Sequence, residues 1–234
     1  MRKIKIISEL FAFTLAEILI VVGIIGIIAQ MTIPQLVADF QVRSTVTALK
    51  KAHSTISQAY TLAVQENGTP DTWGLTVDSV GAQLFLNIFA PYLRITKNCG
   101  TGPGCFPNLT YKDIKGSDYA YWDLFTDRAR AQLFDGTLIM FNTNSATSGS
   151  LGQIYVDING AKAPNQLGKD FFYFRLYKDK VVPAGSPITE GNQAFVDNCM
   201  NNYGFGCAAW VIYNENMDYL KCDDLSWDGK TKCD

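Results

Sequence analysis

The chain has 234 residues, 47% of them hydrophobic and 18% charged, which is the composition of a folding chain and excludes a fully disordered one. Its formal net charge of −2 at pH 7 argues against a protein that binds nucleic acid by general electrostatic attraction, although a local basic patch is compatible with it. The length suits one membrane segment followed by one globular domain, or at most two small domains.

The first residues combine a short basic leader with a long apolar segment. Residues 1–12 hold three basic side chains and one acidic one, and from 13 to 33 the only charged residue is Glu17. As a helix, residues 13–33 would be about 30 Å long, and the basic flank predicts a cytoplasmic leader with the remaining chain outside. An ordinary signal peptide has an apolar core of only about 7–15 residues. A plain signal anchor would tolerate Glu17 without explaining it, since an unpaired carboxylate is costly in hydrocarbon.

The segment FTLAEILIVVGIIGIIAQMTIPQL, residues 13–36, resembles the N-terminus of type IV pilins and of the pseudopilins of type II secretion systems. In that family a membrane peptidase removes the leader just before a phenylalanine, the new amino group is methylated, and the fifth mature residue is glutamate. The resemblance implies cleavage between Ala12 and Phe13, with Ala12 standing where the family usually has glycine. Glu17 then becomes the fifth mature residue.

For Glu17 the resemblance implies a role in assembly. The apolar helices of such filaments pack into a shared core, where a lone carboxylate or ammonium is costly and a pair offsets much of that cost. Paired with the amino group of a neighbouring subunit, Glu17 would select one axial stagger among those that apolar packing allows. The alternative is a glutamate that extends to the membrane interface. Gly23, Gly26 and Pro34 stand where the family often has residues that loosen the helix.

The resemblance also implies partners and a location. The expected partners are identical or homologous pilin or pseudopilin subunits, a prepilin peptidase and methyltransferase, an inner-membrane assembly platform, and membrane lipid before assembly. The precursor would lie in a bacterial inner membrane as a single-pass protein with a cytoplasmic N-terminus and an extracytoplasmic head, and would then enter a periplasmic or extracellular filament.

An amphipathic half of the same helix is expected over residues 34–67. Pro34 lacks a backbone N–H and is expected to bend or locally unwind the helix, and Glu66 to Gly68 form a suitable C-terminal stop. His53 has no evident partner for catalysis and is interpreted as a packing or surface residue. Apolar residues mostly three or four positions apart predict one stripe that packs on a head domain: Leu36, Phe40, Val42, Val46, Leu49, Ile56, Tyr60 and Ala63.

The globular head is expected over residues 68–234. Residues 69–120 are interpreted as a connector with a short helix at 79–93. Beyond them, Asp135–Gly136 between apolar runs predicts a hairpin, and later apolar runs bring the total to about four antiparallel strands. The fold class is therefore α+β, pilin-like, with a long N-terminal helix packed on a small antiparallel sheet and a disulfide-rich C-terminal loop region.

All six cysteines lie downstream of the apolar segment, which favours disulfides in an oxidising compartment. Six cysteines allow fifteen connectivities, and the sequence does not choose among them. Short loops suggest three pairs: Cys99 with Cys105, Cys199 with Cys207, and Cys222 with Cys233. A zinc site is disfavoured, because the chain contains no C-x-x-C pair and a single histidine.

Two oxygen-rich segments raise the question of calcium. One is DINGAKAPNQLGKDFFYF, residues 157–174, which also resembles a segment common in pseudopilin heads. The residues at matching kinds of positions are Asp157, Asn159, Gly160, Pro164, Asn165, Gly168 and Asp170. The segment lacks the EF-hand spacing, so we interpret it as a turn-rich connection between strands whose Asn and Gly adopt unusual backbone angles. The other holds Asp218, Asp223 and Asp224, near the end where pseudopilins sometimes bind calcium, and is interpreted as a solvated acidic tail. No cofactor is expected, and structural calcium is the alternative.

Three functions are compatible with these features. The first is a structural subunit of a type IV pilus or type II secretion pseudopilus. The second is a membrane-anchored enzyme or binding domain, and the third is a minor pilin for adhesion or DNA uptake. The sequence contains no G-x-S-x-G, H-E-x-x-H or P-loop motif and no Gly-rich dinucleotide turn, so we expect no enzyme.

Overall fold

The computed structural model describes residues 14–144, 149–191 and 193–233. The chain divides into two compact units, with the boundary between Gln41 and Val42. The first unit contains the N-terminal half of helix α1 (Leu15–Asn67), and the second contains the remainder of α1 and the head.

Helix α1 is continuous through Pro34, so of the two outcomes expected at that proline, a bend or local unwinding, the unwinding does not occur. Proline removes a single backbone donor, and the surrounding ladder maintains the helix. Next to the proline, the Thr32 hydroxyl donates to the Ile28 carbonyl at 3.0 Å. The helix ends at Asn67, as the stop at Glu66 to Gly68 predicts, and Gly68 follows with a φ of 76°.

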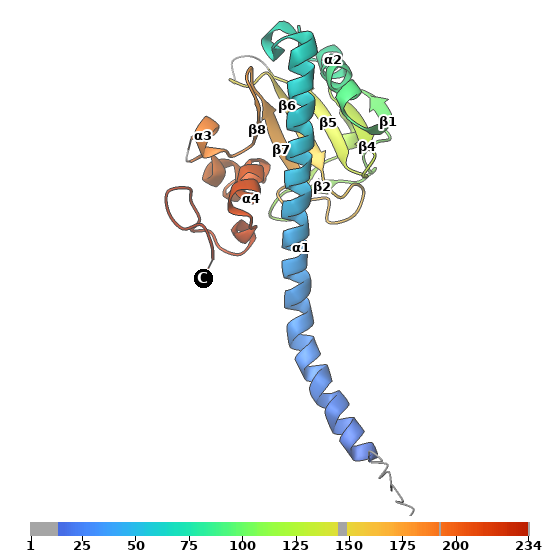
Figure 1. The fold of residues 1–234 in the computed structure, drawn as a ribbon, viewed down its shortest axis with the longest axis vertical. Helices are drawn as coiled ribbons and strands as arrows, with labels where there is room; N and C mark the ends of the chain where they lie inside the picture. The colour runs from blue at the N-terminus through green and yellow to red at the C-terminus, as the bar shows by residue number, and fades with distance from the viewer. Residues whose placement is uncertain (1–13, 145–148, 192, 234) are drawn as a thin grey trace, which may run out of the picture. The chain divides into compact units, whose positions relative to one another are not determined.

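The head is built on one six-stranded antiparallel sheet in the order β1-β4-β5-β6-β7-β8 (Figure 1). Its strands are β1 (Ile95–Gly100), β4 (Ala129–Leu133), β5 (Leu138–Thr143), β6 (Gly152–Asp157), β7 (Phe171–Leu176) and β8 (Val181–Pro183). The hairpin at Asp135–Gly136 is confirmed by the pairing of β4 with β5. The expectation of about four strands is too low, because β1 pairs with β4 from within the segment interpreted as a connector.

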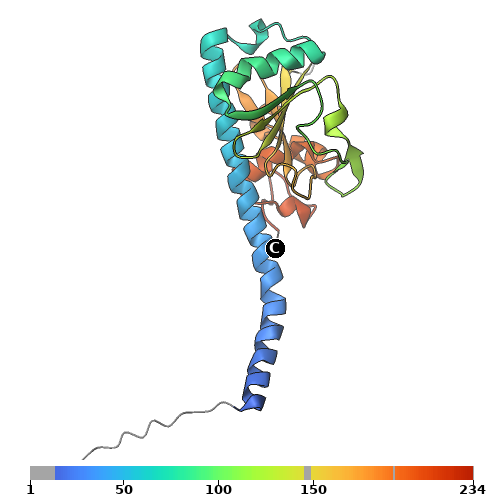
Figure 2. The ribbon, with the colours of Figure 1, turned by 90° about the vertical axis from the view of Figure 1, so that its right-hand side faces the viewer.

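Both faces of the sheet are buried. Ile139 and Phe141 of β5 face the larger core with Leu49 and Ile56 of α1, while the alternating Met140 faces a second core. Figure 2 shows α1 and α2 (Ser79–Phe89) on one side of the sheet, with the segment that contains β2 (Tyr111–Lys112) and β3 (Asp118–Ala120) on the other. The central strands are therefore almost continuously buried, whereas a sheet covered only by the helix would alternate.

The helix stripe is confirmed only from its middle onward. Val46, Leu49 and Ile56 are buried, but Leu36 and Phe40 are 65% and 72% exposed. The stripe therefore ends near the boundary between the two units, because the residues before Val42 have no head surface to cover within their own unit.

The C-terminal region is more regular than the loop region expected from the sequence. It contains the short helices α3 (Pro187–Glu190) and α4 (Ala208–Asn214), a π-helical turn at Val196–Met200, and 3-10 turns at Phe205–Cys207 and Asp218–Leu220. Its core is aromatic, since Trp210 is fully buried and stacks on Phe195 with ring centroids 4.1 Å apart. Further 3-10 turns connect the elements of the head at Pro70–Thr72, Ala90–Tyr92 and Trp122–Leu124.

Candidate functional site

The N-terminal half of α1 exposes apolar side chains on every face. An 18-residue window of the helix has a mean hydropathy of 2.3 and none of it is buried. Among the described residues, this is the one helix long and apolar enough to cross a membrane. Every large hydrophobic residue from Leu15 to Phe40 is exposed within this chain. Such a surface requires lipid or other protein to cover it, because water contact with so many aliphatic side chains is unfavourable.

Glu17 is engaged at the first turn of this helix. Thr14 donates to Glu17 Oε2 through both its backbone N–H and its hydroxyl, each at 2.8 Å. In return, the backbone N–H of Glu17 donates to the Thr14 hydroxyl at 3.2 Å. This reciprocal arrangement is a capping box, which satisfies backbone donors that a helix N-terminus otherwise leaves free. The carboxylate is therefore partnered within the chain itself.

The capping box is a feature that our sequence reasoning missed. Its signal is present in the sequence, because Thr14 precedes Glu17 by three residues at the start of an apolar run. Ala12 and Phe13, the residues at the expected cleavage site, lie outside the described part of the chain. The structure therefore leaves both the cleavage site and the pairing of Glu17 with a neighbouring amino group as predictions.

Gly23 and Gly26 lie on the exposed half of α1. A Cβ atom added to either glycine would meet nothing within 4 Å in this chain. Neither residue has a φ in the left-handed range, so both are helical positions that other residues could occupy. No packing contact within one copy therefore requires glycine at these two positions, and glycine destabilises a helix relative to alanine.

The three disulfides join Cys99 with Cys105, Cys199 with Cys207, and Cys222 with Cys233. These are the short-loop pairings that the cysteine spacing suggests. The bonded Cys199 and Cys207 are fully buried in the head core, and the bond connects the π-helical turn to the turn before α4. Each disulfide closes a short loop, and Cys99, Cys199 and Cys207 lie in β1, in the π-helical turn and in a 3-10 turn.

The segment from Asp157 to Asp170 folds as the turn-rich connection expected. Asn165, Gly160 and Gly168 have φ angles of 50°, 71° and 73°, which are the unusual backbone angles predicted for Asn and Gly here. Asp170 accepts backbone N–H bonds from Asn165 at 2.8 Å and Gln166 at 2.7 Å, and thus closes the turn on itself.

Asp157 is the second carboxylate of this turn and is fully buried. Its Oδ2 accepts a hydrogen bond from the buried Tyr111 hydroxyl at 2.6 Å, and its Oδ1 accepts from the Asn159 N–H at 3.2 Å. Burial, followed by the charge of nearby Asp170, raises the pKa of Asp157 to about 8. Burial likewise raises the pKa of Asp170 and of Tyr111 above their ordinary values.

These contacts bear on the calcium alternative. Each oxygen of the Asp157 and Asp170 carboxylates already accepts a hydrogen bond from an N–H or O–H donor. In the described ranges, His, Cys, Asp and Glu side chains form no group of three that could hold a metal ion. Near the C-terminus, Asp218 pairs with Lys221 and accepts the Cys233 N–H at 3.1 Å, and Asp224 pairs with Lys230.

Arg130 is a buried cation that the sequence did not reveal. Its guanidinium donates to the carbonyls of Trp122, Thr101, Gly102, Arg128 and Phe125. These carbonyls belong to the disulfide loop at 99–105 and to the connection between β3 and β4. The arginine therefore fixes the loops that cover the second face of the sheet, a structural task.

His53 is a packing residue, as interpreted from the sequence. Its imidazole stacks on Phe174 with ring centroids 5.6 Å apart, and burial lowers its pKa.

Comparisons with protein-family models, with curated proteins and with solved structures find no match for this chain. The geometry and the sequence therefore carry the functional argument.

Proposed function

We propose that this chain is a structural subunit of a type IV pilus or a type II secretion pseudopilus. It is made as a prepilin, cleaved and N-methylated before Phe13, and polymerised through the apolar half of its helix. The observation that carries the proposal is the exposure of apolar side chains on every face of α1 from Leu15 to Phe40. In a simple membrane anchor that surface would contact only lipid. In a filament subunit it contacts lipid before assembly and the helices of other copies after it.

Glu17 supports this proposal through its position. In the unassembled chain, Thr14 provides donors for the carboxylate, so its charge is partly satisfied near the membrane surface. In the filament, the amino group of a neighbouring Phe13 replaces or joins these donors and neutralises the charge. The capping box thus gives the carboxylate a partner before assembly, and the neighbouring amino group sets the axial register during it.

Gly23 and Gly26 support the same proposal. A Cβ atom added to either glycine would meet no atom beyond the adjacent helix backbone, so this surface of the helix is available to another helix. Small residues allow close approach of helix backbones where apolar side chains alone provide no preference for one partner.

The proposal places the precursor in a bacterial inner membrane, with the leader in the cytoplasm and the head outside. The three disulfides fit an oxidising compartment for the head. The partners are other pilin or pseudopilin subunits, a prepilin peptidase and methyltransferase, and an assembly platform. The head serves as a packing and surface module, and the proposal requires no catalytic step and no cofactor.

The experiment is mass spectrometry of the N-terminus in cells with an active prepilin peptidase. The full chain is recovered from the membrane fraction and from material sheared off the cells. We expect a mature form that begins at methylated Phe13, enriched in the sheared fraction. An Ala12→Gly variant serves as a matched control and should be cleaved at least as completely. A chain that keeps residues 1–12 in both variants would refute the proposal.

A further inference from the structure

A small cavity lies beside strand β8, on the side of the head that carries His53. Its volume is about 160 Å³, and its lining includes His53, Val182, Pro183, Ser186, Ile188 and Tyr213. We name it the His53 cavity. An engineered apolar cavity of about 150 Å³ in another protein binds a benzene molecule. The size of the His53 cavity therefore suits one aromatic ring.

The lining of the His53 cavity also suits an aromatic ring. Val182 and Pro183 provide buried apolar walls, and Ile188, which is 83% exposed, stands at the open rim. Ser186 is 1% exposed, and its hydroxyl has no hydrogen-bond partner among the described residues. A buried donor without a partner is unfavourable, and the face of an aromatic ring is a weak acceptor for it. An aliphatic occupant would leave the hydroxyl without any acceptor.

A large aromatic side chain stands exposed elsewhere on the same head. Phe134, in the turn between β4 and β5, is 66% exposed. The Arg94 guanidinium carbon lies 4.7 Å from the centre of its ring, and the Phe134 N–H donates to the Arg94 carbonyl at 2.7 Å. We name Phe134 with Arg94 the Phe134 knob. Its ring is held in place although most of it faces solvent.

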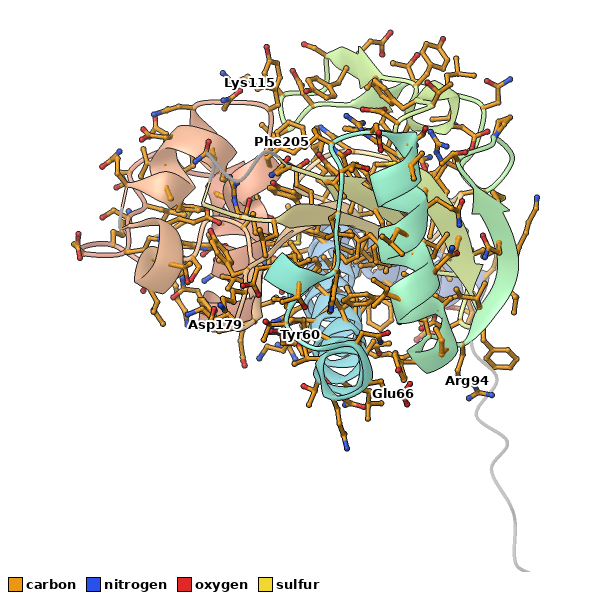
Figure 3. The ribbon with its side chains drawn as sticks, turned by 90° about the horizontal axis from the view of Figure 1, so that it is seen from above. Tyr60, Glu66, Arg94, Lys115, Asp179 and Phe205 are labelled. Atoms are coloured by element: carbon orange, nitrogen blue, oxygen red, sulfur yellow. A yellow bond between two sulfur atoms is a disulfide. The ribbon has the colours of Figure 1, made fainter. Side chains whose placement is uncertain are left out.

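The knob and the cavity lie on opposite flanks of α1. The knob turn is tied to one flank, because Lys51 of α1 pairs with Asp135 at 2.6 Å. The cavity is lined by His53, which follows Lys51 by two residues in α1. Two residues correspond to a rotation of about 200° around the helix axis, so the two side chains point to opposite flanks. Figure 3 shows Arg94 and Asp179 on opposite sides of α1, and β1 and β8 are the two edges of the sheet. A copy therefore cannot fill its own cavity.

We propose that the Phe134 knob of one copy inserts into the His53 cavity of a neighbouring copy when the chain assembles. This inference rests on the proposed function, since it assigns a head contact within the same polymer. Different surfaces of two identical chains meet in it, which is the heterologous contact that builds helical filaments. A second copy is the occupant because the chain itself carries the matching ring on the opposite flank.

Beside the cavity, the exposed Asp179 offers an opposite charge to the Arg94 cation of the knob, whereas Lys180 of the lining has the same sign as Arg94. The knob carries the Arg94 cation. Next to Lys180 of the cavity lining, the Asp179 carboxylate is 72% exposed and lies 3.9 Å from the Lys180 ammonium. That separation is at the limit of an ion pair, so Asp179 is available to a second cation. An approaching Arg94 would supply it.

The contact is too small to hold two copies together alone. An aromatic side chain buries about 150–250 Å², whereas stable interfaces bury about 1,200 Å² or more. It becomes effective once the apolar helices have brought the copies together, because the second contact is then intramolecular. The knob and cavity therefore orient neighbouring heads within the filament.

Site-specific photo-crosslinking of the full chain tests the inference. A photoreactive phenylalanine analogue replaces Phe134 in cells that assemble the filament, and the cross-linked peptides are identified by mass spectrometry. We expect a cross-linked dimer whose second peptide comes from residues 180–189 or includes Tyr213. The same analogue at Leu124, which is 62% exposed and belongs to the turn Trp122–Leu124, is the matched control and should not reach that peptide.

A charge exchange provides a second readout. With the analogue at position 134, Arg94→Glu or Asp179→Arg alone should reduce the dimer yield about two- to five-fold, and the two together should restore it. All three side chains are at the surface, so the fold should persist. A dimer that maps elsewhere, a cross-link to a different protein, or no dimer at all overturns the inference. Such results in sheared filaments with a mature N-terminus leave the proposed function standing, whereas an unprocessed chain absent from filaments refutes the function as well.

Discussion

Replacement of Asp157 by asparagine should change how the stability of the head depends on pH. Asp157 is fully buried beside Asp170 and Tyr111, and its pKa in the folded chain is raised from 3.8 to about 8. In the unfolded chain the carboxyl has its ordinary pKa. Between pH 3.8 and about 8 the unfolded chain therefore loses the Asp157 proton while the folded chain keeps it. Because the unfolded state binds fewer protons there, the free energy of unfolding falls as the pH rises.

The size of the effect follows from this linkage. Each pH unit in that window lowers the free energy of unfolding by about 1.4 kcal/mol. From pH 5 to pH 7 the loss attributable to Asp157 is therefore about 2.7 kcal/mol. The asparagine side chain of the variant has no such titration. The substitution also disturbs the bonds from Tyr111 and Asn159, at a cost of about 1–3 kcal/mol, but that cost is the same at every pH.

The assay is urea unfolding of the detergent-solubilised full chain at pH 5, 6, 7 and 8, followed by tryptophan fluorescence. We expect the difference in unfolding free energy between Asp157→Asn and the parent chain to move in favour of the variant by about 2.7 kcal/mol between pH 5 and pH 7. Asp135→Asn is the control, because Asp135 lies at the surface and pairs with Lys51. A difference for Asp157→Asn that stays constant with pH would refute the assigned pKa.

Three further predictions concern the helix and the turn. Glu17→Val should leave membrane insertion intact and reduce incorporation into sheared filaments. Glu17→Gln keeps an oxygen acceptor for Thr14 and removes only the charge, so it distinguishes the role of the charge from that of the helix cap. Normal filament yield for both variants would contradict the register role. Leu49→Ala, at a fully buried position, should lower the unfolding free energy of the head by about 2–5 kcal/mol in the same urea assay. Leu36→Ala, at an exposed position, should change that free energy by no more than about 0.5 kcal/mol relative to the parent chain. Millimolar calcium at pH 7 should not shift the urea midpoint of the parent chain, because Asp170 already accepts N–H donors on both oxygens and Asp157, with a pKa of about 8, keeps its proton. A rise in the midpoint that Asp170→Asn abolishes would reveal a calcium site instead.

Local patterns predicted much of the backbone correctly. The hairpin at Asp135–Gly136 follows from two residues that favour a tight turn, and the stop after Asn67 follows from Gly68. The helix at 79–93 is present as α2, followed by a 3-10 turn. These features depend on neighbours in the sequence, so a short window contains the information that determines them.

The missed features depend on residues far apart in the chain. Strand β1 lies in the segment that the sequence predicts to be a connector. Its sequence ITKNCG is mostly polar, and its pairing with β4 makes it a strand. From the sequence alone Arg130 would be placed at the surface. In the structure, carbonyls of the loops at 101–102 and 122–128 surround its guanidinium. The His53 cavity likewise requires α1, β8 and α4 to be placed together.

The sequence by itself determined the membrane-length helix, the position of Glu17 at its start and the preference for short disulfide loops, because each is set by composition and spacing over a few turns of chain. Only the tertiary structure decided that the sheet is buried on both faces, that the helix stripe ends near Val42, and that Asp157 and Asp170 share one buried turn. The physical reason is that burial and charge coupling are properties of neighbours in space. No window of sequence specifies which residues will provide them.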